Sequence, residues 1–181
     1  MRKNSKSSQS ETKFGIELVR ELSKKYLCFK DGRVDYSKAE IAPIVTCFIM
    51  YNHKIFLAKR GNKVKTYKGK WCTVAGYYDR PIEAEKIALM ELEEEASISK
   101  NQIERVIEGT PFSYTDKSYG ITWIVHPFLF IVNSDNIALD WEHEQMCWIE
   151  PEELPKYETV PMLQRSLDSV LENLKTAQLN K

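Results

Sequence analysis

The sequence predicts an α/β fold, and three stretches of the chain carry that prediction. Residues 44–51 and 55–59 are rich in β-branched and aromatic side chains and flank a short turn, as in a β-hairpin. Residues 76–98 run from a glycine-containing loop into an amphipathic helix. Residues 121–132 are a long apolar run that is typical of a central strand. Strands and helices therefore alternate, as expected for an α/β domain.

The length and the local composition favour one domain that follows a short arm. At 181 residues the chain is long enough for one well-developed core, whereas two domains would be small. Residues 1–11 are polar, serine-rich and basic and lack the apolar segment of a secretory signal, so we expect a disordered tail. Residues 12–43 are expected to form a helix and an Asp-Gly turn that pack on the domain or on a second subunit. Residues 44–181 are expected to form the domain itself.

The elements that follow the acidic helix are predicted from their apolar patterns. Residues 103–107 and 110–114 are predicted strands. The long apolar run contains Pro127, which indicates a bulge or an edge at that point, and we interpret the histidine before it as a core residue. Residues 160–174 are a predicted amphipathic closing helix, with Pro161 tolerated in its first turn.

Charge and hydropathy exclude several classes of protein. The 26 basic and 26 acidic residues balance, and no dense basic stretch is interleaved with aromatic residues, so a general nucleic-acid binder is not expected. No stretch approaches the roughly 18 consecutive apolar residues of a membrane span, so we expect no membrane partner. The four cysteines are widely scattered, and we interpret them as reduced, buried thiols of a cytoplasmic protein.

A cluster of glutamates near the end of the predicted helix is the main candidate site. At about 100° per residue, Glu91, Glu94 and Glu95 share one face of the helix. Glu93 points elsewhere. Like charges at this spacing repel by about 0.2–0.5 kcal/mol per pair, so the cluster costs stability unless a cation lies among the carboxylates. An acidic run is also a common solvated helix surface, and the charge pattern alone leaves that alternative open.

The chemistry of the cluster indicates which cation and which substrate it would suit. Ligation by oxygen alone suits Mg²⁺ or Mn²⁺ better than zinc, which prefers nitrogen and sulfur. Mg²⁺ usually takes one or two protein carboxylates and completes its shell with water and substrate phosphate oxygens. The cluster therefore predicts a phosphate ester or anhydride as substrate. The backbone of Gly76 is a further candidate ligand, because glycine allows close approach where the loop turns into the helix.

The same stretch resembles the Nudix box. That pattern is Gly, five residues, Glu, seven residues, Arg-Glu, an aliphatic residue, any residue, Glu-Glu, any residue, Gly and an aliphatic residue. Alignment on the first glycine puts five residues in register: Glu91, Leu92, Glu94, Glu95 and Ile98. An aliphatic residue replaces the first Glu, Met replaces the Arg and Ser replaces the second Gly: Ile82, Met90 and Ser97. The Arg of the pattern orients the neighbouring carboxylates, so its loss is expected to weaken catalysis more than metal binding.

Two further segments resemble the family. Trp71 is kept before the box, while Val74 and Ala75 take the place of the family's Pro and first Gly. After the long apolar run, the chain has the family's Glu-His pair, Trp-aliphatic strand and acidic turn in order: Glu142-His143, Trp148-Ile149 and Glu152-Glu153-Leu154. The resemblance covers about residues 44–174 and implies an α/β/α sandwich with a mixed sheet. It also implies a metal-dependent hydrolase of a diphosphate linkage in a nucleoside diphosphate joined to another moiety, and homodimers are common in the family.

The substrate side of the site has weaker candidates. Lys59 and Arg60 end a predicted strand and are either an ordinary charged strand end or a pair of cations that reach the substrate phosphates. Glu142 and Glu144 are either an extra metal ligand and general base or part of a solvated acidic loop. For the base that accepts a proton from the attacking water, the two adjacent helix carboxylates, Glu94 and Glu95, rank ahead of these two.

Two other functions stay open. A Nudix-fold binding or regulatory module that keeps ligand affinity but hydrolyses poorly would account for the residues at positions 82 and 90. An isomerase of isopentenyl diphosphate, whose family shares the fold, would use a cysteine near the sheet, for which Cys47 and Cys72 are candidates. Four aromatic residues are suited to stack on a base or to fill the core: Tyr77, Tyr78, Tyr114 and Trp123. The sequence therefore predicts a nucleotide-like small molecule but no named substrate.

Overall fold

The computed structural model describes residues 14–179. The expected tail, residues 1–11, lies outside the described residues. The helices are α1 (Gly15–Lys25), α2 (Ala84–Ala96) and α3 (Leu163–Leu179), with the short 3₁₀ helices η1 (Lys100–Gln102) and η2 (Pro151–Lys156). The strands are β1 (Ile41–Tyr51), β2 (Lys54–Arg60), β3 (Trp71–Cys72), β4 (Val74–Tyr77), β5 (Ile103–Glu108), β6 (Phe112–Asp116), β7 (Ile121–Val132) and β8 (His143–Ile149).

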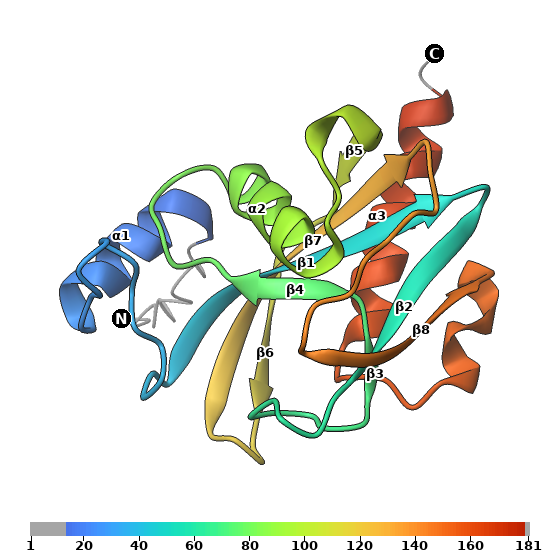
Figure 1. The fold of residues 1–181 in the computed structure, drawn as a ribbon. Helices are drawn as coiled ribbons and strands as arrows, with labels where there is room; N and C mark the ends of the chain where they lie inside the picture. Colours follow the sequence, from blue (N-terminus) through green and yellow to red (C-terminus); the bar gives the residue numbers. More distant parts are fainter. Residues whose placement is uncertain (1–13, 180–181) are drawn as a thin grey trace, which may run out of the picture.

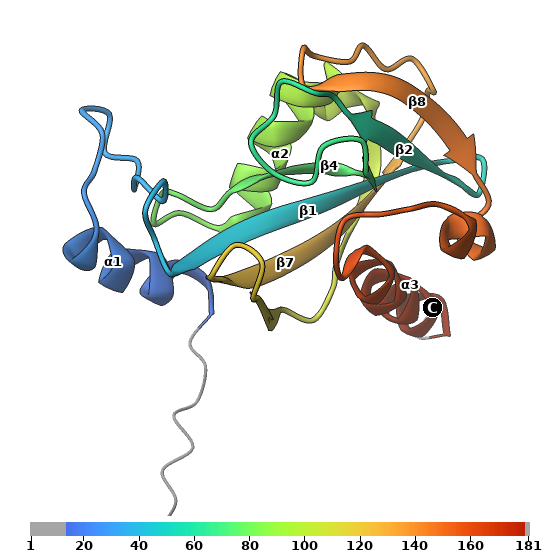
Figure 2. The same cartoon turned by 90° about the horizontal axis from the view of Figure 1, so that it is seen from below.

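The strands form one mixed sheet that lies between two layers of helix. The main strand order is β3-β2-β1-β7-β5, with β4 paired to β1, β6 to β7 and β8 to β2. The long strands β1 and β7 pair in parallel, whereas β1 pairs with β2 and β4 in antiparallel fashion. α2 covers one face and α3 covers the other, as Figure 1 and Figure 2 show. This confirms the predicted α/β/α sandwich with an N-terminal helix.

The two faces of β1 show why both layers of helix are needed. Successive side chains of a strand point to opposite faces of the sheet. Cys47 and Ile49 join a buried cluster with Leu92 of α2. Phe48 joins a second cluster with Leu167 of α3. The central strands are therefore apolar on both faces, which explains the continuous apolar runs in their sequences.

The predicted β-hairpin forms between β1 and β2. The turn residues Asn52 and His53 have φ values of 47° and 66°, as a two-residue hairpin turn of type I′ requires. His53 is exposed, in keeping with a place in the turn. At its other end β1 begins at Ile41, so the domain boundary expected at residue 44 falls inside a strand.

Pro127 lies where β7 changes its antiparallel partner. Residues 121–125 of β7 pair with β6, and residues 128–132 pair with β5. The carbonyl of Pro127 accepts a hydrogen bond from the Gly109 amide at 2.8 Å, so the side on which proline lacks an N–H faces the gap between the two partners. His126 is buried, and burial lowers its pKa to about 4. It is a core residue, as the sequence indicates.

Two sequence interpretations need correction. The closing helix begins at Leu163 and not at residue 160, because Met162 has a φ of 62° and breaks the helical path after Pro161. The four cysteines are all free thiols, but only Cys47 and Cys72 are buried, whereas Cys28 is exposed and Cys147 is half-buried. Within residues 14–179, no helix is both long enough and apolar enough to cross a membrane.

The N-terminal arm packs on the domain. Four of its apolar residues are buried in the same cluster as α2: Val19, Leu22, Val34 and Tyr36. The turn that follows α1 has Gly32 at a φ of 84°, a conformation that favours glycine. The Val34 amide donates to the Asp79 carbonyl at 2.9 Å, and the Tyr36 hydroxyl donates to the Tyr78 carbonyl at 3.2 Å. The arm is therefore bonded directly to the loop that precedes α2.

Candidate active site

The candidate active site is a pocket beside the point where β1 changes its pairing from β4 to β2. Residues 44–47 of β1 pair with β4, whereas only residues 50–51 pair with β2. A pocket of about 360 Å³ lies beside this divergence and is lined by β1, β4, α2, the β2–β3 connection and the start of α3. Its volume is within the range of small-molecule sites, which is about 300–1,000 Å³.

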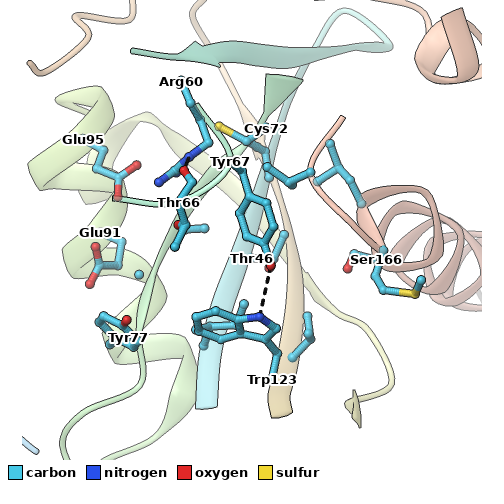
Figure 3. A pocket seen from close by; sticks show the side chains of 18 of the residues that line it. Thr46, Arg60, Thr66, Tyr67, Cys72, Tyr77, Glu91, Glu95, Trp123 and Ser166 are labelled. Atoms are coloured by element: carbon cyan, nitrogen blue, oxygen red, sulfur yellow. Dashed lines mark hydrogen bonds between the residues drawn. The ribbon is translucent and has the colours of Figure 1, made fainter. Parts of the chain in front are cut away.

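Glutamates of α2 form one side of this pocket, here called the acidic wall (Glu91, Glu94 and Glu95). Figure 3 shows Glu91 and Glu95 projecting from α2 towards the pocket. Glu93 is exposed and does not line it. The structure therefore brings together the three glutamates that the helical spacing predicts and leaves out the fourth.

Burial makes the acidic wall electrostatically costly. Glu95 is only 9% exposed, and its burial, with the charges of Glu91 and Glu142 nearby, raises its pKa to about 9. Burial also raises the pKa of Glu91 to about 7, helped by the charges of Glu94 and Asp79. At neutral pH the Glu95 carboxyl keeps its proton and the Glu91 carboxyl is about half protonated unless a cation lies beside them. The wall is a set of acceptors whose negative charge is not balanced within α2.

The absence of a side chain at Gly76 lets the Glu91 carboxylate lie directly against the backbone of β4. A Cβ atom built at this position would lie 2.0 Å from Cδ of Glu91, so any other residue would displace that carboxylate. Gly76 does not have a positive φ, and the reason for glycine here is space rather than backbone conformation. The glycine at the start of the box and the first glutamate of the acidic wall therefore lie in direct contact.

The donor chemistry of the acidic wall suits a hard divalent ion, but the side chains do not converge on one point. Carboxylate oxygens are the ligands that Mg²⁺ and Mn²⁺ prefer, and the buried negative charge would be compensated by such an ion. Among residues 14–179, no group of three or more His, Cys, Asp or Glu side chains is arranged to hold a metal ion as it stands. Coordination by several of these carboxylates would require them to rotate towards one another.

The opposite side of the pocket is here called the loop wall (Arg60, Thr66, Tyr67 and Trp123). Arg60 Nε donates to the Thr66 carbonyl at 3.1 Å. The Tyr67 hydroxyl donates to Asp116 Oδ2 at 2.6 Å and accepts from Trp123 Nε1 at 3.2 Å, the bond drawn in Figure 3. Tyr67 has a φ of 52°, which is unusual for a bulky residue. These bonds hold the β2–β3 connection against the β6–β7 hairpin.

Two further pairs of residues were predicted for the site, Lys59 with Arg60 and Glu142 with Glu144, and one residue of each pair lines the pocket. Arg60 lines the pocket, whereas Lys59 does not. Glu142 lines the pocket, and its backbone is fixed by a bond from the Gly61 amide to its carbonyl at 2.8 Å. Glu144 is exposed and instead accepts a bond from the Asn62 amide at 3.1 Å. Lys59 and Glu144 thus lie outside the pocket.

A chain of polar contacts supports the loop that carries Glu142. Asp140 Oδ1 accepts from the Glu142 amide at 3.0 Å and lies 3.0 Å from His143 Nδ1. His143 Nε2 lies 3.6 Å from Cys72 Sγ. Cys72 lines the pocket, but its burial raises the thiol pKa to about 12, so at neutral pH it is a thiol and not the nucleophilic thiolate. Cys47 is buried in the core and does not line the pocket.

The aromatic candidates divide between the pocket and the core. Tyr77 and Trp123 line the pocket, with ring centroids 6.2 Å apart and an angle of 29° between their planes. Tyr114 also lines it. Tyr78 is fully buried and belongs to the core. Stacking on a base therefore stays a hypothesis for the first three residues alone.

Sequence reasoning missed two charged residues of the pocket, Arg33 and Asp79. Arg33 belongs to the arm, which the resemblance does not cover. Asp79 lies within the box stretch, at a position where the pattern specifies no residue. The only local signal was the Asp-Gly turn before Arg33, and such a turn does not reveal which part of the domain its side chains approach.

Comparisons with known proteins agree with this fold. The NUDIX domain matches residues 41–170, which is more than half of the chain. An Ap4A hydrolase of C. elegans, solved as a binary complex, is 21% identical with a TM-score of 0.60, over 75% of this chain and 98% of that one. A MutT NUDIX hydrolase from Burkholderia pseudomallei is 22% identical with a TM-score of 0.59, over 72% of this chain and 98% of that one.

A third structure is the NUDIX domain of Shewanella oneidensis NrtR with ADP ribose, which is 13% identical with a TM-score of 0.62, over 76% of this chain and 90% of that one. No curated protein sequence matches the chain. At these identities the solved structures show the fold, and the domain match shows the family. The chain belongs to the NUDIX domain family.

Proposed function

We propose that this protein is a metal-dependent pyrophosphohydrolase that cleaves the diphosphate linkage of a nucleoside diphosphate joined to another moiety. One observation carries the proposal: Glu91, Glu94 and Glu95 line a single pocket together with a cation and aromatic rings. The cation can bind phosphate oxygens directly, and the acidic wall can bind them through a metal ion. The aromatic rings offer a flat surface on which a nucleobase can stack. The family and the hydrolases among its structural neighbours support the same activity.

The residues divide into three roles. The acidic wall would hold Mg²⁺ or Mn²⁺ through its carboxylate oxygens, with the Gly76 carbonyl and Glu142 as further ligands. When bound, such an ion neutralises the diphosphate and lowers the pKa of a water molecule. Arg60 contacts the phosphate oxygens from the opposite side. Glu94, the exposed member of the acidic wall, accepts a proton from the attacking water ahead of Glu95.

The substrate class follows from the second half of the pocket. Tyr77 is 44% exposed and lies beside Trp123, so one face of this aromatic pair is available to a ligand. Two of the neighbours named above are an Ap4A hydrolase and a NUDIX domain solved with ADP ribose, and both ligands are nucleotide-like molecules. We therefore assign a nucleotide-like substrate in which the phosphates lie between Arg60 and the acidic wall and the base lies near Tyr77.

A hydrolysis screen tests this function. The purified protein is incubated with Mg²⁺ and with Mn²⁺ against nucleoside triphosphates, nucleotide sugars, ADP-ribose, dinucleoside polyphosphates and NADH. Glu95→Gln serves as the blank, and Glu93→Gln is the matched control because it makes the same change on the exposed side of the same helix. Turnover that is kept by Glu93→Gln and lost by Glu95→Gln supports the proposal. Turnover that both variants keep contradicts it.

A second candidate is a binding or regulatory module with little hydrolysis. Ile82 and Met90, which replace the first Glu and the Arg of the Nudix pattern, both pack against the main buried cluster and present no charge to the pocket. The carboxylates also do not converge as they stand. Metal-dependent binding of a nucleotide without turnover, across the whole panel, would favour this function.

A further inference from the structure

The charges that line the pocket are unequal and are arranged in a definite way. The acidic residues are Asp79, Glu91, Glu94, Glu95 and Glu142, and the basic residues are Arg33 and Arg60. Arg60 belongs to the loop wall. Arg33 comes from the N-terminal arm, which precedes the residues that match the NUDIX domain. The two cations of the pocket therefore reach it from separate parts of the chain.

Contacts with two aspartates orient the Arg33 side chain. Its Nε donates to Asp31 Oδ2 at 2.8 Å and lies 3.9 Å from Asp79 Oδ2. The pKa of Arg33 is raised mainly by the bond to Asp31 and also by the negative charge of Glu94, so the guanidinium is within electrostatic range of the acidic wall. The side chain is 46% exposed and keeps guanidinium surface that a ligand can reach.

The backbone of the arm holds Arg33 in register with the loop before α2. Val34, the next residue, is 2% exposed and its amide donates to the Asp79 carbonyl at 2.9 Å. The Phe29 amide donates to the Arg33 carbonyl at 2.8 Å across the Asp-Gly turn. These two hydrogen bonds fix the backbone on both sides of the Arg33 side chain.

α2 supplies no cation to its own carboxylates. The last turn of the helix contains no basic residue, and Lys86 pairs with Glu83 at 2.8 Å at the other end. Met90 is partly buried against the core. Arg33 is a basic lining residue whose charge lowers the pKa of Glu91 and is itself acted on by the charge of Glu94.

We propose that Arg33 binds the phosphate groups of the substrate, and that the N-terminal arm is a working part of the active site. A guanidinium presents several N–H donors in one plane and matches phosphate oxygens, while its Nε stays on Asp31. Arg33 from the arm and Arg60 from the loop wall would then both bind the phosphate chain that faces the acidic wall. This inference rests on the proposed function, because it concerns the same substrate.

The test compares two ligands, of which only pyrophosphate should bind more weakly when the Arg33 guanidinium is removed. Mn²⁺ alone and inorganic pyrophosphate with saturating Mn²⁺ are each titrated by calorimetry into the full chain and into Arg33→Gln. Loss of the guanidinium should weaken pyrophosphate binding by about 10- to 100-fold, because charged hydrogen bonds are lost. Mn²⁺ binding should stay the same or tighten, because a positive charge near the carboxylates is gone.

Two further variants serve as controls. Arg20 lies in the same arm and bonds its own nearby carboxylate, Glu17, at 2.7 Å, but it does not line the pocket. Arg20→Gln should change both affinities by less than about twofold, as exposed pairs contribute little. Arg33→Lys keeps the charge but not the planar donors and should recover only part of the pyrophosphate affinity.

The possible failures are distinguishable. If Arg33→Gln changes pyrophosphate affinity no more than Arg20→Gln does, the inference is wrong. If it weakens Mn²⁺ and pyrophosphate binding together, Arg33 has a structural role and the inference is again overturned. If the full chain binds no Mn²⁺, the proposed metal site fails, and pyrophosphate binding that still depends on Arg33 would uphold the inference alone.

Discussion

The acidic wall comes from two turns of a single helix, whereas the loop wall combines side chains of β2, the β2–β3 connection and β7. They also differ in how their polar groups are satisfied. Arg60 and Tyr67 of the loop wall make hydrogen bonds within the protein. Glu95 of the acidic wall is buried and Glu91 is half-buried, and burial raises the pKa of both. The loop wall is stable by itself, whereas the acidic wall becomes stable only when it binds protons or a cation.

The largest expected effect is on turnover when a buried member of the acidic wall is neutralised. Glu95→Gln keeps the shape of the side chain but removes a candidate ligand, and we expect turnover to fall by at least about 100-fold. Substitution of a residue that only hydrogen-bonds to a metal ligand already lowers activity by about 10- to 100-fold. Steady-state kinetics on the substrate found in the screen measures this. Glu93→Gln should stay within about twofold of the unmodified protein, as expected of an exposed surface residue. Equal losses in both would remove the distinction between the two faces of α2.

The next effect is on stability without metal, and it distinguishes the two walls by pH. Folding raises the pKa of Glu95 from 4.5 to about 9, so the folded protein binds one more proton than the unfolded chain between these values. Its stability contribution is full below pH 4.5 and is lost as the pH rises towards about 9. From pH 6.5 to 8.5 the free energy of unfolding should fall by about 2–3 kcal/mol.

Urea unfolding in the presence of a chelator checks this slope. Glu95→Gln should remove most of it and should be the more stable protein at high pH, because the buried charge at position 95 is gone. The loop wall contributes nothing to the slope, because burial raises the pKa of the Tyr67 hydroxyl further above this pH range. A slope that is identical in both proteins would contradict the buried carboxylate.

A smaller effect is expected when the contact between Gly76 and Glu91 is broken. The Cβ of Gly76→Ala would meet the end of the Glu91 side chain, which can turn away with little cost in stability. Turnover should fall by about 10-fold through the displaced carboxylate, with little change in melting temperature. In a Glu91→Gln background, the same alanine should have no further effect on turnover. Additive losses would show that Gly76 acts independently of Glu91.

The smallest effect on the site concerns the loop wall. Tyr67→Phe removes the bonds to Asp116 and from Trp123 and should lower the free energy of unfolding by about 2 kcal/mol, which is about 1 kcal/mol for each of the two hydrogen bonds. Affinity for Mn²⁺ should be unchanged, because Tyr67 lies across the pocket from the acidic wall. Denaturant unfolding and calorimetry measure the two quantities. A loss of metal affinity would mean that the walls are coupled.

The same contrast explains what could be predicted from the sequence. The acidic wall follows from a three- and four-residue spacing on one helix, and the sheet follows from runs such as that of β1, because both are local patterns. The exclusion of Glu93 from the pocket is a direct consequence of helical geometry. The alternation of strands and helices indicated an α/β fold, whereas the α/β/α layering was implied by the resemblance to the Nudix family. The predicted start of the closing helix was three residues early, because Pro161 and Met162 precede the helix.

The loop wall and Arg33 could not be predicted in this way. Tyr67 meets Asp116 across 49 residues of sequence, and no local pattern relates the two. Lys59 and Arg60 are adjacent, and which of them reaches the pocket depends on a register shift between β2 and β8 at that point. Arg33 depends on how the arm docks beside the loop before α2. These contacts are set by tertiary packing, which a single sequence does not display.

The most direct test of the metal site is a calorimetric titration of Mn²⁺ at pH 7 in two buffers with different ionisation enthalpies. We predict binding that releases between about one and two protons, because the Glu95 carboxyl must lose its proton to accept the ion and the Glu91 carboxyl, with a pKa of about 7, must lose the part of a proton that it keeps at this pH. Glu95→Gln should bind weakly and release about one proton fewer, and Glu93→Gln should behave like the unmodified protein. Absence of binding, or proton release that is the same in Glu95→Gln, would contradict a metal site on the acidic wall.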